Sequence, residues 1–217
     1  MLSEFRHFSI MCSMIKNLIF DMGGVLIEWN PSEMLEREHV SEEDRKLIFE
    51  KAFNNYKWNL LDAGYYEKEE DFLAEICPTL PEHLQSLITR IVMDFGEEFM
   101  RPMPGMEELI KKLSKNGYKI YLLSNAGPGH DKYWSKIPSS RYFDKIMVSA
   151  LEKMYKPERL IIQHALETFD AKADESVFID DLAINCAGAF LAGITPINFK
   201  SVGSLIEELE KLGVNCN

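Results

Sequence analysis

A short apolar run that ends in a carboxylate constrains the fold of this chain more than any other feature. Residues 18–20, Leu-Ile-Phe, have the composition of a strand buried on both faces of a parallel sheet. Asp21 ends the run, and Gly23 and Gly24 allow a sharp turn whose N–H groups can approach an anion closely. Open α/β sheets bind ligands at the carboxyl ends of their strands, so Asp21 is predicted to be a nucleophile or a metal ligand. An Asp that begins an ordinary turn is the alternative.

Composition limits the fold and the partners. The 217 residues, of which 46% are hydrophobic, suit one α/β domain with an insertion, or two small domains. The formal net charge of −11 argues against nucleic acid and anionic membranes as partners, because such surfaces need clustered Lys and Arg. An anionic small substrate would then have to be held by local donors and a cation. The cysteines lack metal-type spacing, and reduced thiols are expected at Cys12, Cys77, Cys186 and Cys216.

The N-terminal residues have the pattern of neither a membrane span nor a secretory signal. No apolar run in the sequence reaches the length of a bilayer-spanning helix. Residues 1–13 are interrupted by Glu4, Arg6 and His7, and we expect a poorly ordered extension with Met14 as an alternative start. The predicted location is cytoplasmic. The sequence leaves the choice between a monomer and a homodimer open.

Residues 31–100 have helical patterns and no clear strand. Ser41 and Asp44 resemble a capping box for a helix over 42–53, and further helices are predicted over 67–76 and from Pro81 onward. In the last of these, apolar residues recur at helical spacing at Leu84, Leu87, Ile88, Ile91, Val92, Phe95 and Phe99. The block predicts a small helical bundle inserted after the first strand. Its aromatic residues are expected to pack inside that bundle, namely Tyr56, Trp58, Tyr65 and Tyr66.

From residue 101 onward helices and strands alternate. Helices are predicted over 106–113, 157–169, 183–191 and 201–212, with strands over 119–123, 145–149, 176–179 and 195–199. On the helix that begins at Pro157, the buried side is expected to carry Leu160, Ile161, Ala165 and Phe169. The alternation implies right-handed crossovers and a parallel, doubly wound α/β sheet. The predicted division is an extension over 1–13, a core over 14–30 and 101–217, and a helical segment over 31–100.

Three of the predicted strands end in polar groups that would be costly to bury without a purpose. These groups are Asp21, Ser124 and the pair Asp180 and Asp181, and they are expected to meet at one edge of the sheet. Lys156 follows the strand over 145–149 on the same side. Carboxylates, a hydroxyl and an ammonium together would bind a hard cation and a phosphoryl group. Taken singly, each has an ordinary alternative as a helix cap, a strand end or a solvated residue.

At these residues the sequence resembles the haloacid dehalogenase superfamily, whose members are mostly Mg²⁺-dependent phosphohydrolases. Its four motifs occur in order, at 20–25 (Phe-Asp-Met-Gly-Gly-Val), 122–125 (Leu-Leu-Ser-Asn), 155–157 (Tyr-Lys-Pro) and 177–181 (Val-Phe-Ile-Asp-Asp) with Asn185. The resemblance covers residues 14–212. The segment 31–100 matches the helical cap of this superfamily, which closes over the site and selects the substrate.

The resemblance implies a nucleophile and a metal site. Asp21 would attack phosphorus in line and form an aspartyl-phosphate, which water then hydrolyses. Mg²⁺ would be held by the carboxylate of Asp21, the backbone carbonyl of Gly23 and the carboxylate of Asp181. Asp180 would bind the metal directly or through water.

The resemblance also implies a phosphate-binding set. Ser124 and the backbone N–H groups that follow Asp21 and Ser124 would bind phosphoryl oxygens; the residues concerned include Met22, Gly23 and Asn125. Lys156 would offset the charge of the phosphoryl oxygens and keep Asp21 ionised.

The sequence departs from the superfamily at Gly23. Most of its phosphatases carry there a second Asp, which protonates the leaving oxygen and later activates water. Losing such assistance costs about 10²–10⁴-fold in rate, so another group supplies the proton or the leaving group needs less help. A sugar 1-phosphate leaves as a comparatively acidic hemiacetal oxygen. This fits a further resemblance, carried by Gly23 and residues 123–125, 133–134 and 156–164, to the bacterial glucose-1-phosphate phosphatase branch, which implies a sugar phosphate as substrate.

Three other residues are weaker candidates for the site. His130 could supply a proton, although a histidine in a surface loop without such a role is the favoured interpretation. Asp62 and Arg101 could contact the substrate from the cap.

Two other classes of function stay open beside a phosphatase that acts on a small phosphorylated metabolite. A 2-haloacid dehalogenase needs no metal, and the Asp180 and Asp181 carboxylates would then lie beside an anionic substrate without a cation, which disfavours it. A catalytically silent regulator would keep the fold and bind a phosphorylated ligand. The retention of Asp21, Lys156 and Asp181 together argues against such a regulator.

Overall fold

The fold is built on one parallel sheet, seen in a computed structural model that describes residues 14–217. Five strands pair in the order β3-β2-β1-β4-β5, so the first strand of the chain lies at the centre. Their bounds are β1 (Asn17–Phe20), β2 (Lys119–Ser124), β3 (Lys145–Val148), β4 (Ser176–Asp180) and β5 (Thr195–Asn198). The predicted parallel α/β sheet is confirmed. The predictions for residues 1–13, including Cys12, lie outside the described residues.

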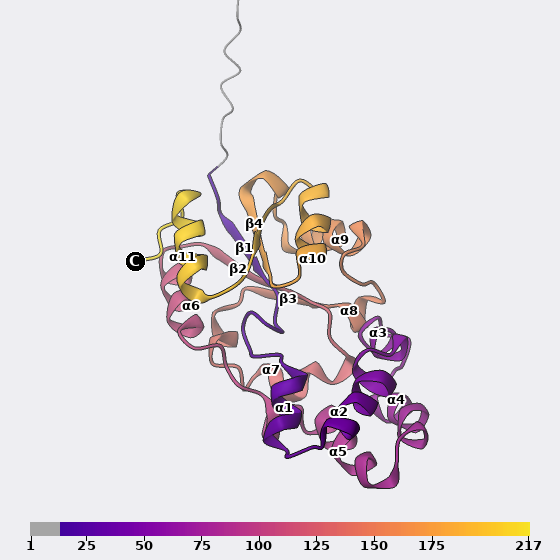
Figure 1. The fold of residues 1–217 in the computed structure, drawn as a ribbon. Coiled ribbons are helices and arrows are strands. Elements are labelled where there is room, and N and C mark those ends of the chain that lie inside the picture. Colours follow the sequence, from indigo (N-terminus) through magenta and orange to yellow (C-terminus); the bar gives the residue numbers. More distant parts are fainter. Residues whose placement is uncertain (1–13) are drawn as a thin grey trace, which may run out of the picture.

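Helices cover both faces of the sheet, as Figure 1 shows. Leu18 and Phe20 point to the face covered by α6 (Met106–Lys115) and α11 (Val202–Lys211), whereas Ile19 points to the face covered by α9 (Arg159–Phe169) and α10 (Ala183–Leu191). Because successive side chains of a strand alternate between faces, a run that is apolar at every position can fill two cores at once. The doubly wound arrangement therefore follows directly from the 18–20 run.

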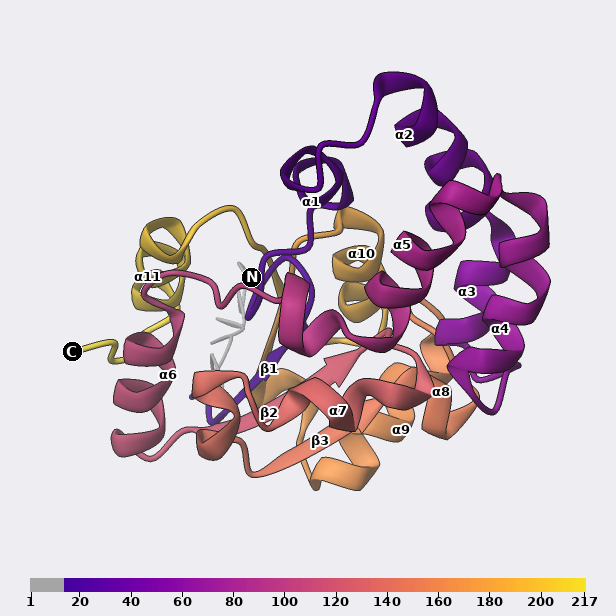
Figure 2. The same ribbon diagram turned by 90° about the horizontal axis from the view of Figure 1, so that it is seen from below.

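The inserted segment forms a helical cap at the carboxyl ends of the strands (Figures 1 and 2). Among the described residues, 31–100 contain helices and no strand. The main helices are α1 (Pro31–Arg37), α2 (Glu42–Ile48), α3 (Tyr56–Asp62), α4 (Glu69–Ile76) and α5 (Glu82–Met93), with π-helical turns η1 (Phe49–Phe53) and η3 (Phe95–Phe99). The connecting elements are η2 (Cys77–Thr79), η4 (Pro128–His130), α7 (Asp131–Trp134), η5 (Pro138–Tyr142), α8 (Ser149–Glu152) and η6 (Ala173–Glu175).

Several local predictions need correction. The helix expected to run from Pro81 to Phe99 ends at Met93, because Asp94 leaves helical geometry at φ −112°, and η3 follows as a separate turn. Leu160 is 66% exposed rather than buried, because successive side chains of α9 point about 100° apart and the buried side of the helix runs through Ile161, Ala165 and Phe169. Ile162 is buried in its place.

The aromatic residues of the cap do not all pack as expected. Tyr66 is buried, but Tyr56 and Tyr65 are 65% and 71% exposed. Trp58 packs edge-on against Phe72 and also lines a cavity, described below. Cys77, Cys186 and Cys216 are free thiols, as predicted. None of the described helices combines the length and the apolar character that crossing a membrane requires.

Candidate active site

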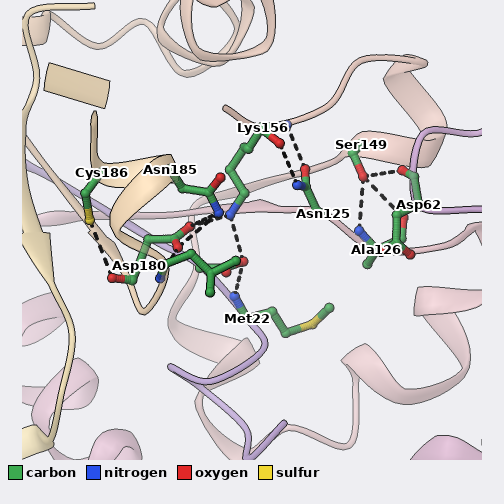
Figure 3. Close-up of polar contacts among 11 residues, drawn as sticks. Met22, Asp62, Asn125, Ala126, Ser149, Lys156, Asp180, Asn185 and Cys186 are labelled. Atoms are coloured by element: carbon green, nitrogen blue, oxygen red, sulfur yellow. Dashed lines mark hydrogen bonds and ion pairs between the residues drawn. The ribbon is translucent and has the colours of Figure 1, made fainter. Parts of the chain in front are cut away.

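The polar strand ends meet at one edge of the sheet. Asp21 follows β1, and Ser124 is the last residue of β2. Asp180 is the last residue of β4, and Asp181 follows it. Both β2 and β4 pair with β1. Lys156 reaches the same edge from the loop between α8 and α9, as Figure 3 shows. The arrangement arises because parallel strands present their carboxyl ends together. The structure thus brings together the side chains that the sequence analysis singled out.

Lys156 is the buried centre of this cluster. Its side chain is 1% exposed, and its Nζ lies 2.9 Å from Asp21 Oδ1 and 2.7 Å from Asp180 Oδ2. Burial lowers the pKa of the ammonium, but the two carboxylates more than offset this and hold the pKa above its usual value. Lys156 therefore stays charged and fixes both carboxylates in position.

The two carboxylate oxygens of Asp21 have different surroundings. Oδ1 accepts hydrogen bonds from Lys156 Nζ and, at 2.7 Å, from the backbone N–H of Met22. Among the described residues no hydrogen bond to Oδ2 is found, so this oxygen is available to a ligand. Burial raises the pKa of Asp21; Lys156 opposes that shift, and Asp180 adds to it.

Asp180 uses both oxygens within the protein. Oδ2 accepts from Lys156 Nζ and Asn185 Nδ2, and Oδ1 accepts from Asn185 Nδ2 and from the backbone N–H of Leu182 at 2.9 Å (Figure 3). The Asn185 bonds are 3.1 Å long. Since a carboxylate has about four lone-pair positions, this one is nearly saturated. It is suited to holding Lys156 and the start of α10.

The donor set fits a hard divalent cation. Oxygen atoms of Asp21, Asp180 and Asp181 all lie within 4.8 Å of one another. Lys156 contributes one positive charge beside three carboxylates, so a bound cation would compensate the remaining negative charge, and carboxylate oxygens are ligands that Mg²⁺ prefers. A Cβ on Gly24 would lie 2.5 Å from Asp181 Oδ2, and its φ is +72°. Only glycine lets the turn after β1 approach Asp181 this closely.

Ser124 presents an unused hydroxyl to the same edge. Its side chain is 1% exposed, and among the described residues its Oγ has no hydrogen-bond partner. A buried hydroxyl without a hydrogen-bond partner lowers the stability of the fold. This cost disappears when an oxyanion accepts a hydrogen bond from the hydroxyl. Ser124 also lines the cavity that contains Asp21. The orphaned Oγ is therefore placed for an anionic ligand.

Asn125 uses its side chain to hold the Lys156 loop. Its Nδ2 donates to the backbone carbonyl of Lys156 at 3.0 Å, and its Oδ1 accepts from the backbone N–H of Lys156 at 2.9 Å (Figure 3). The amide thereby ties the loop to the end of β2. Its side chain is committed to this contact, which leaves the backbone N–H as the group of Asn125 that could reach a ligand.

A cavity of ≈ 450 Å³ separates this edge from the cap, and Asp62 lines it from the cap side. No hydrogen bond to the Asp62 carboxylate is found among the described residues. Burial, and secondarily the charge of Asp21, raises the pKa of Asp62 to about 7. From its sequence context Asp62 is only a weak candidate, because nothing in its spacing along the chain reveals that it lines the same cavity as Asp21.

The backbone around Asp62 is attached to the core. Ser149 Oγ donates to the carbonyl of Asp62 at 2.5 Å and accepts from the N–H of Ala126 at 3.0 Å (Figure 3). At Gly64, with φ +73°, a Cβ would lie 2.1 Å from the carbonyl oxygen of Ala150. This close approach holds the end of α3 against the core, and thereby holds Asp62 toward the cavity.

The remaining two weak candidates differ from each other. His130 was expected in a surface loop, and this is wrong: it is buried, it lines the cavity, and its Nδ1 has no partner among the described residues. The short helical turn η4 folds it inward. Arg101 lies outside the residues that line the cavity, and its guanidinium donates to the carbonyls of Glu98 and Met100.

Curated proteins with similar sequences include two phosphatases and a dehalogenase. The chain is 29% identical over 212 residues to the sesquiterpene phosphatase astK of Aspergillus oryzae, covering 95% of this chain and 100% of that protein. It is 24% identical over 205 residues to a glyceraldehyde 3-phosphate phosphatase of Pyrococcus furiosus, covering 86% and 81%. The (S)-2-haloacid dehalogenase 4A of Burkholderia cepacia is 23% identical over 205 residues, covering 89% and 87%.

A solved structure and a family model agree with these relatives. The HAD family enzyme bt-2542 of Bacteroides thetaiotaomicron, in complex with magnesium and inorganic phosphate, superposes with a TM-score of 0.67 at 26% identity, covering 87% of this chain and 96% of that one. The family model of haloacid dehalogenase-like hydrolases matches residues 15–193. The resemblance to the phosphatases of the superfamily is thus confirmed, and the chain belongs to the haloacid dehalogenase-like hydrolases.

Proposed function

We propose that this enzyme hydrolyses the monophosphate of a small metabolite with Mg²⁺ as cofactor, through an aspartyl-phosphate on Asp21. One observation carries the proposal: the buried ion pair of Asp21 and Lys156 lies beside the half-buried carboxylate of Asp181, and an orphaned Ser124 hydroxyl lines the same cavity. A nucleophile, a cation site and an oxyanion donor together are what phosphoryl transfer requires.

In the first half-reaction Asp21 forms the new bond. The oxygen that lacks a protein donor, Oδ2, attacks phosphorus, and the bond between phosphorus and the leaving oxygen breaks. Ser124 Oγ–H donates to a phosphoryl oxygen, and Lys156 holds Asp21 ionised and aligned. Mg²⁺, held by Asp21, Asp181 and the carbonyl of Gly23, would lower the repulsion between the nucleophile and the anionic phosphate. Asp180 orients Lys156 and is a ligand only through water, because its oxygens are already occupied.

Asp62 takes the place of the carboxylate that is missing at Gly23. With a pKa of about 7 it can be protonated in one half-reaction and ionised in the next. It gives its proton to the leaving oxygen, and then accepts a proton from the water that attacks the phosphoryl group. The bond between phosphorus and Asp21 breaks in that second step and releases inorganic phosphate. His130 lines the same cavity, and its Nδ1 has no partner among the described residues.

The alternatives have less support. A dehalogenase relative exists, but three clustered carboxylates beside a single Lys156 suit a cation better than a metal-free site for a haloacid. A silent regulator would not need Asp21 with one carboxylate oxygen left, among the described residues, without a protein donor in the cavity. The relatives' names point to substrates as different as sesquiterpene and glyceraldehyde phosphates. A sugar phosphate as the substrate therefore stays a prediction. The cytoplasmic location also stays a prediction.

An assay with p-nitrophenyl phosphate tests the proposal. We expect turnover with Mg²⁺ that is abolished by EDTA, restored by added Mg²⁺, and abolished by Asp21→Asn. Asp131→Asn, an exposed Asp outside the cavity, is the matched control and should keep full activity. A wild-type protein that is inert toward a broad panel of phosphates would favour the regulator, and metal-independent release of halide from a 2-haloacid would favour the dehalogenase.

A further inference from the structure

The part of the cavity that faces the cap is aromatic. Among the described residues, seven aromatic side chains line the cavity, and one of them, Tyr155, precedes Lys156 at the polar edge. The other six are contributed by the segment after β1, by η1, α3, η3 and α7: Trp29, Phe49, Phe53, Trp58, Phe95 and Tyr133. They adjoin the polar edge, because Asp21 and Ser124 line the same cavity. A substrate whose phosphate lies at Asp21 therefore extends its leaving group toward these rings.

The six side chains form one continuous wall. Trp29 is central. The centroid of its ring lies 5.4 Å from the ring centroid of Phe95, 5.9 Å from that of Trp58 and 6.2 Å from that of Phe53. Phe49 extends the wall beyond Phe53 at 5.5 Å, and Tyr133 extends it beyond Phe95 at 5.3 Å. These are normal packing distances between aromatic rings, so the wall is preformed rather than assembled by a ligand. A preformed apolar wall binds apolar groups at little cost in ordering.

The charges around the cavity exclude a second anionic group on the substrate. No Lys or Arg is found among the described residues that line it, and Lys156 lies buried behind Asp21. The cap contributes two carboxylates instead, Asp62 and Glu69. Glu69 is paired with Lys132, whose Nζ lies 3.3 Å from its Oε2, whereas no ion pair to Asp62 is found among the described residues. A diphosphate, a phosphorylated acid or a nucleotide would therefore place its second negative charge near Asp62 without a further cation at the cavity to balance it.

We infer that the natural substrate is the monophosphate of an uncharged, apolar alcohol, whose hydrocarbon part packs against the Trp29, Trp58 and Phe95 side of the cavity. The inference rests on the proposed function, because it takes the space above Asp21 as the leaving-group site. It differs from the sugar phosphate expected from the sequence. The six rings themselves offer a sugar few hydrogen-bond partners, although Asn54, Asn59 and His130 also line the cavity. A sugar hydroxyl that packs against the rings stays unpaired, and an unpaired buried hydroxyl weakens binding.

A series of n-alkyl monophosphates tests the inference on the wild-type enzyme. We expect kcat/KM to rise about three- to fourfold for each added methylene from butyl to octyl, until the cavity is filled. Geranyl monophosphate, which adds double bonds that can stack on the rings, should exceed glucose 1-phosphate and glucose 6-phosphate by at least about 10²-fold. A kcat/KM that does not change with chain length, or that is higher for the glucose phosphates, would overturn the inference.

Substitutions locate the effect. Trp58→Ala should lower kcat/KM for octyl monophosphate by about tenfold or more and for butyl monophosphate by much less, because only the longer chain reaches the ring. Tyr56→Ala is the matched control: it lies two residues away on α3, is exposed, and does not line the cavity. It should leave the chain-length dependence unchanged. If Trp58→Ala lowered kcat/KM equally for octyl and butyl monophosphate, the aromatic wall would not be the binding surface for the hydrocarbon part of the leaving group.

A binding measurement separates this inference from the proposed function. Calorimetry on Asp21→Asn with Mg²⁺ should show tighter binding of octyl monophosphate than of glucose 1-phosphate, with a negative heat-capacity change that marks apolar burial. If the wild type turns over phosphates without this preference, the function stands and the inference fails. If the preference is found in a protein that hydrolyses nothing, the wall binds as inferred and the proposed function fails.

Discussion

The two walls of the central cavity are built in opposite ways. The strand-edge wall is polar, and its side chains hold one another: Lys156 bridges Asp21 and Asp180, and Asn125 fixes the Lys156 loop. The cap wall is aromatic, and rings from five segments meet by packing alone. Under the proposed function, the contrast means that the reaction would depend on a few atoms with defined partners, whereas the choice of substrate would depend on a surface. Asp62 would be the exception, because it is a polar group of the proposed reaction that lies on the cap.

The largest effect is expected from removing the nucleophile. Asp21→Asn should lower kcat by at least about 10⁴-fold with every phosphate ester, because no aspartyl-phosphate can form. Steady-state kinetics with Mg²⁺ measure this, and acid-quenched labelling should find phosphate attached to the wild type but not to the variant. A loss confined to one class of ester would mean that the strand-edge wall does not carry the common chemistry.

Asp62→Asn should have the next largest effect, and one that depends on the leaving group. For an alkyl monophosphate we expect a loss of about 10²–10⁴-fold, because an alkoxide needs a proton as it leaves. For p-nitrophenyl phosphate the first turnover should stay fast, since p-nitrophenolate leaves without one, and a burst should precede slow hydrolysis.

The pH dependence of the first turnover gives a second measure of Asp62. The acid form exists below its pKa of about 7 and is lost above it, so the alkyl ester rate of the wild type should fall as pH rises through 7. The Asn variant should lack that decline. Equal losses with both esters would show that Asp62 does not supply the proton.

Gly64→Ala tests how the cap wall is held against the core. The added Cβ would meet the carbonyl of Ala150, and φ +73° disfavours any L side chain. We expect the free energy of unfolding to fall by about 1–3 kcal/mol, with a smaller loss of activity as Asp62 shifts. Gly203→Ala, on α11 with open space around its Cβ, is the control and should be neutral or stabilising. Denaturant unfolding compares the two.

The smallest effect concerns stability in the absence of metal. The pKa of Asp62 is raised in the folded state, so protonation of this group favours folding at low pH, and that contribution is lost as pH rises toward 7. Asp62→Asn should therefore stabilise the metal-free protein more at pH 8 than at pH 5, by about 1 kcal/mol after allowance for partial exposure. Thermal unfolding at the two pH values checks this. If Asp62→Asn were less stable than the wild type at pH 8, the Asp62 carboxylate could not be an uncompensated buried charge.

The strand-edge wall could be predicted because each of its residues is tied to a local pattern. Asp21, Ser124 and Asp181 sit at strand ends, and the rule that parallel strands end at one edge brings them together without knowledge of any loop. His130 and Leu160 were misjudged because neither stands at a strand end. The short turn η4 folds His130 inward, and on α9 residues 160–162 are all apolar, so spacing alone did not show which of them face the core. Successive side chains of a helix point about 100° apart, so Leu160 faces solvent when Ile161 and Ile162 are buried.

By itself, the sequence determined the parallel sheet, the helical insertion and the polar edge, because alternation, strand-end carboxylates and glycine turns act over a few neighbouring residues. Only the tertiary structure decided which residues of the cap, and of the segment that precedes it, line the cavity with Asp21. Trp29, Trp58, Phe95 and Asp62 meet across the cavity from separate segments, and such a meeting depends on how helices pack and on the close contact at Gly64. Packing between segments distant in sequence has no signature in any one of them, which is why the substrate wall became visible only in three dimensions.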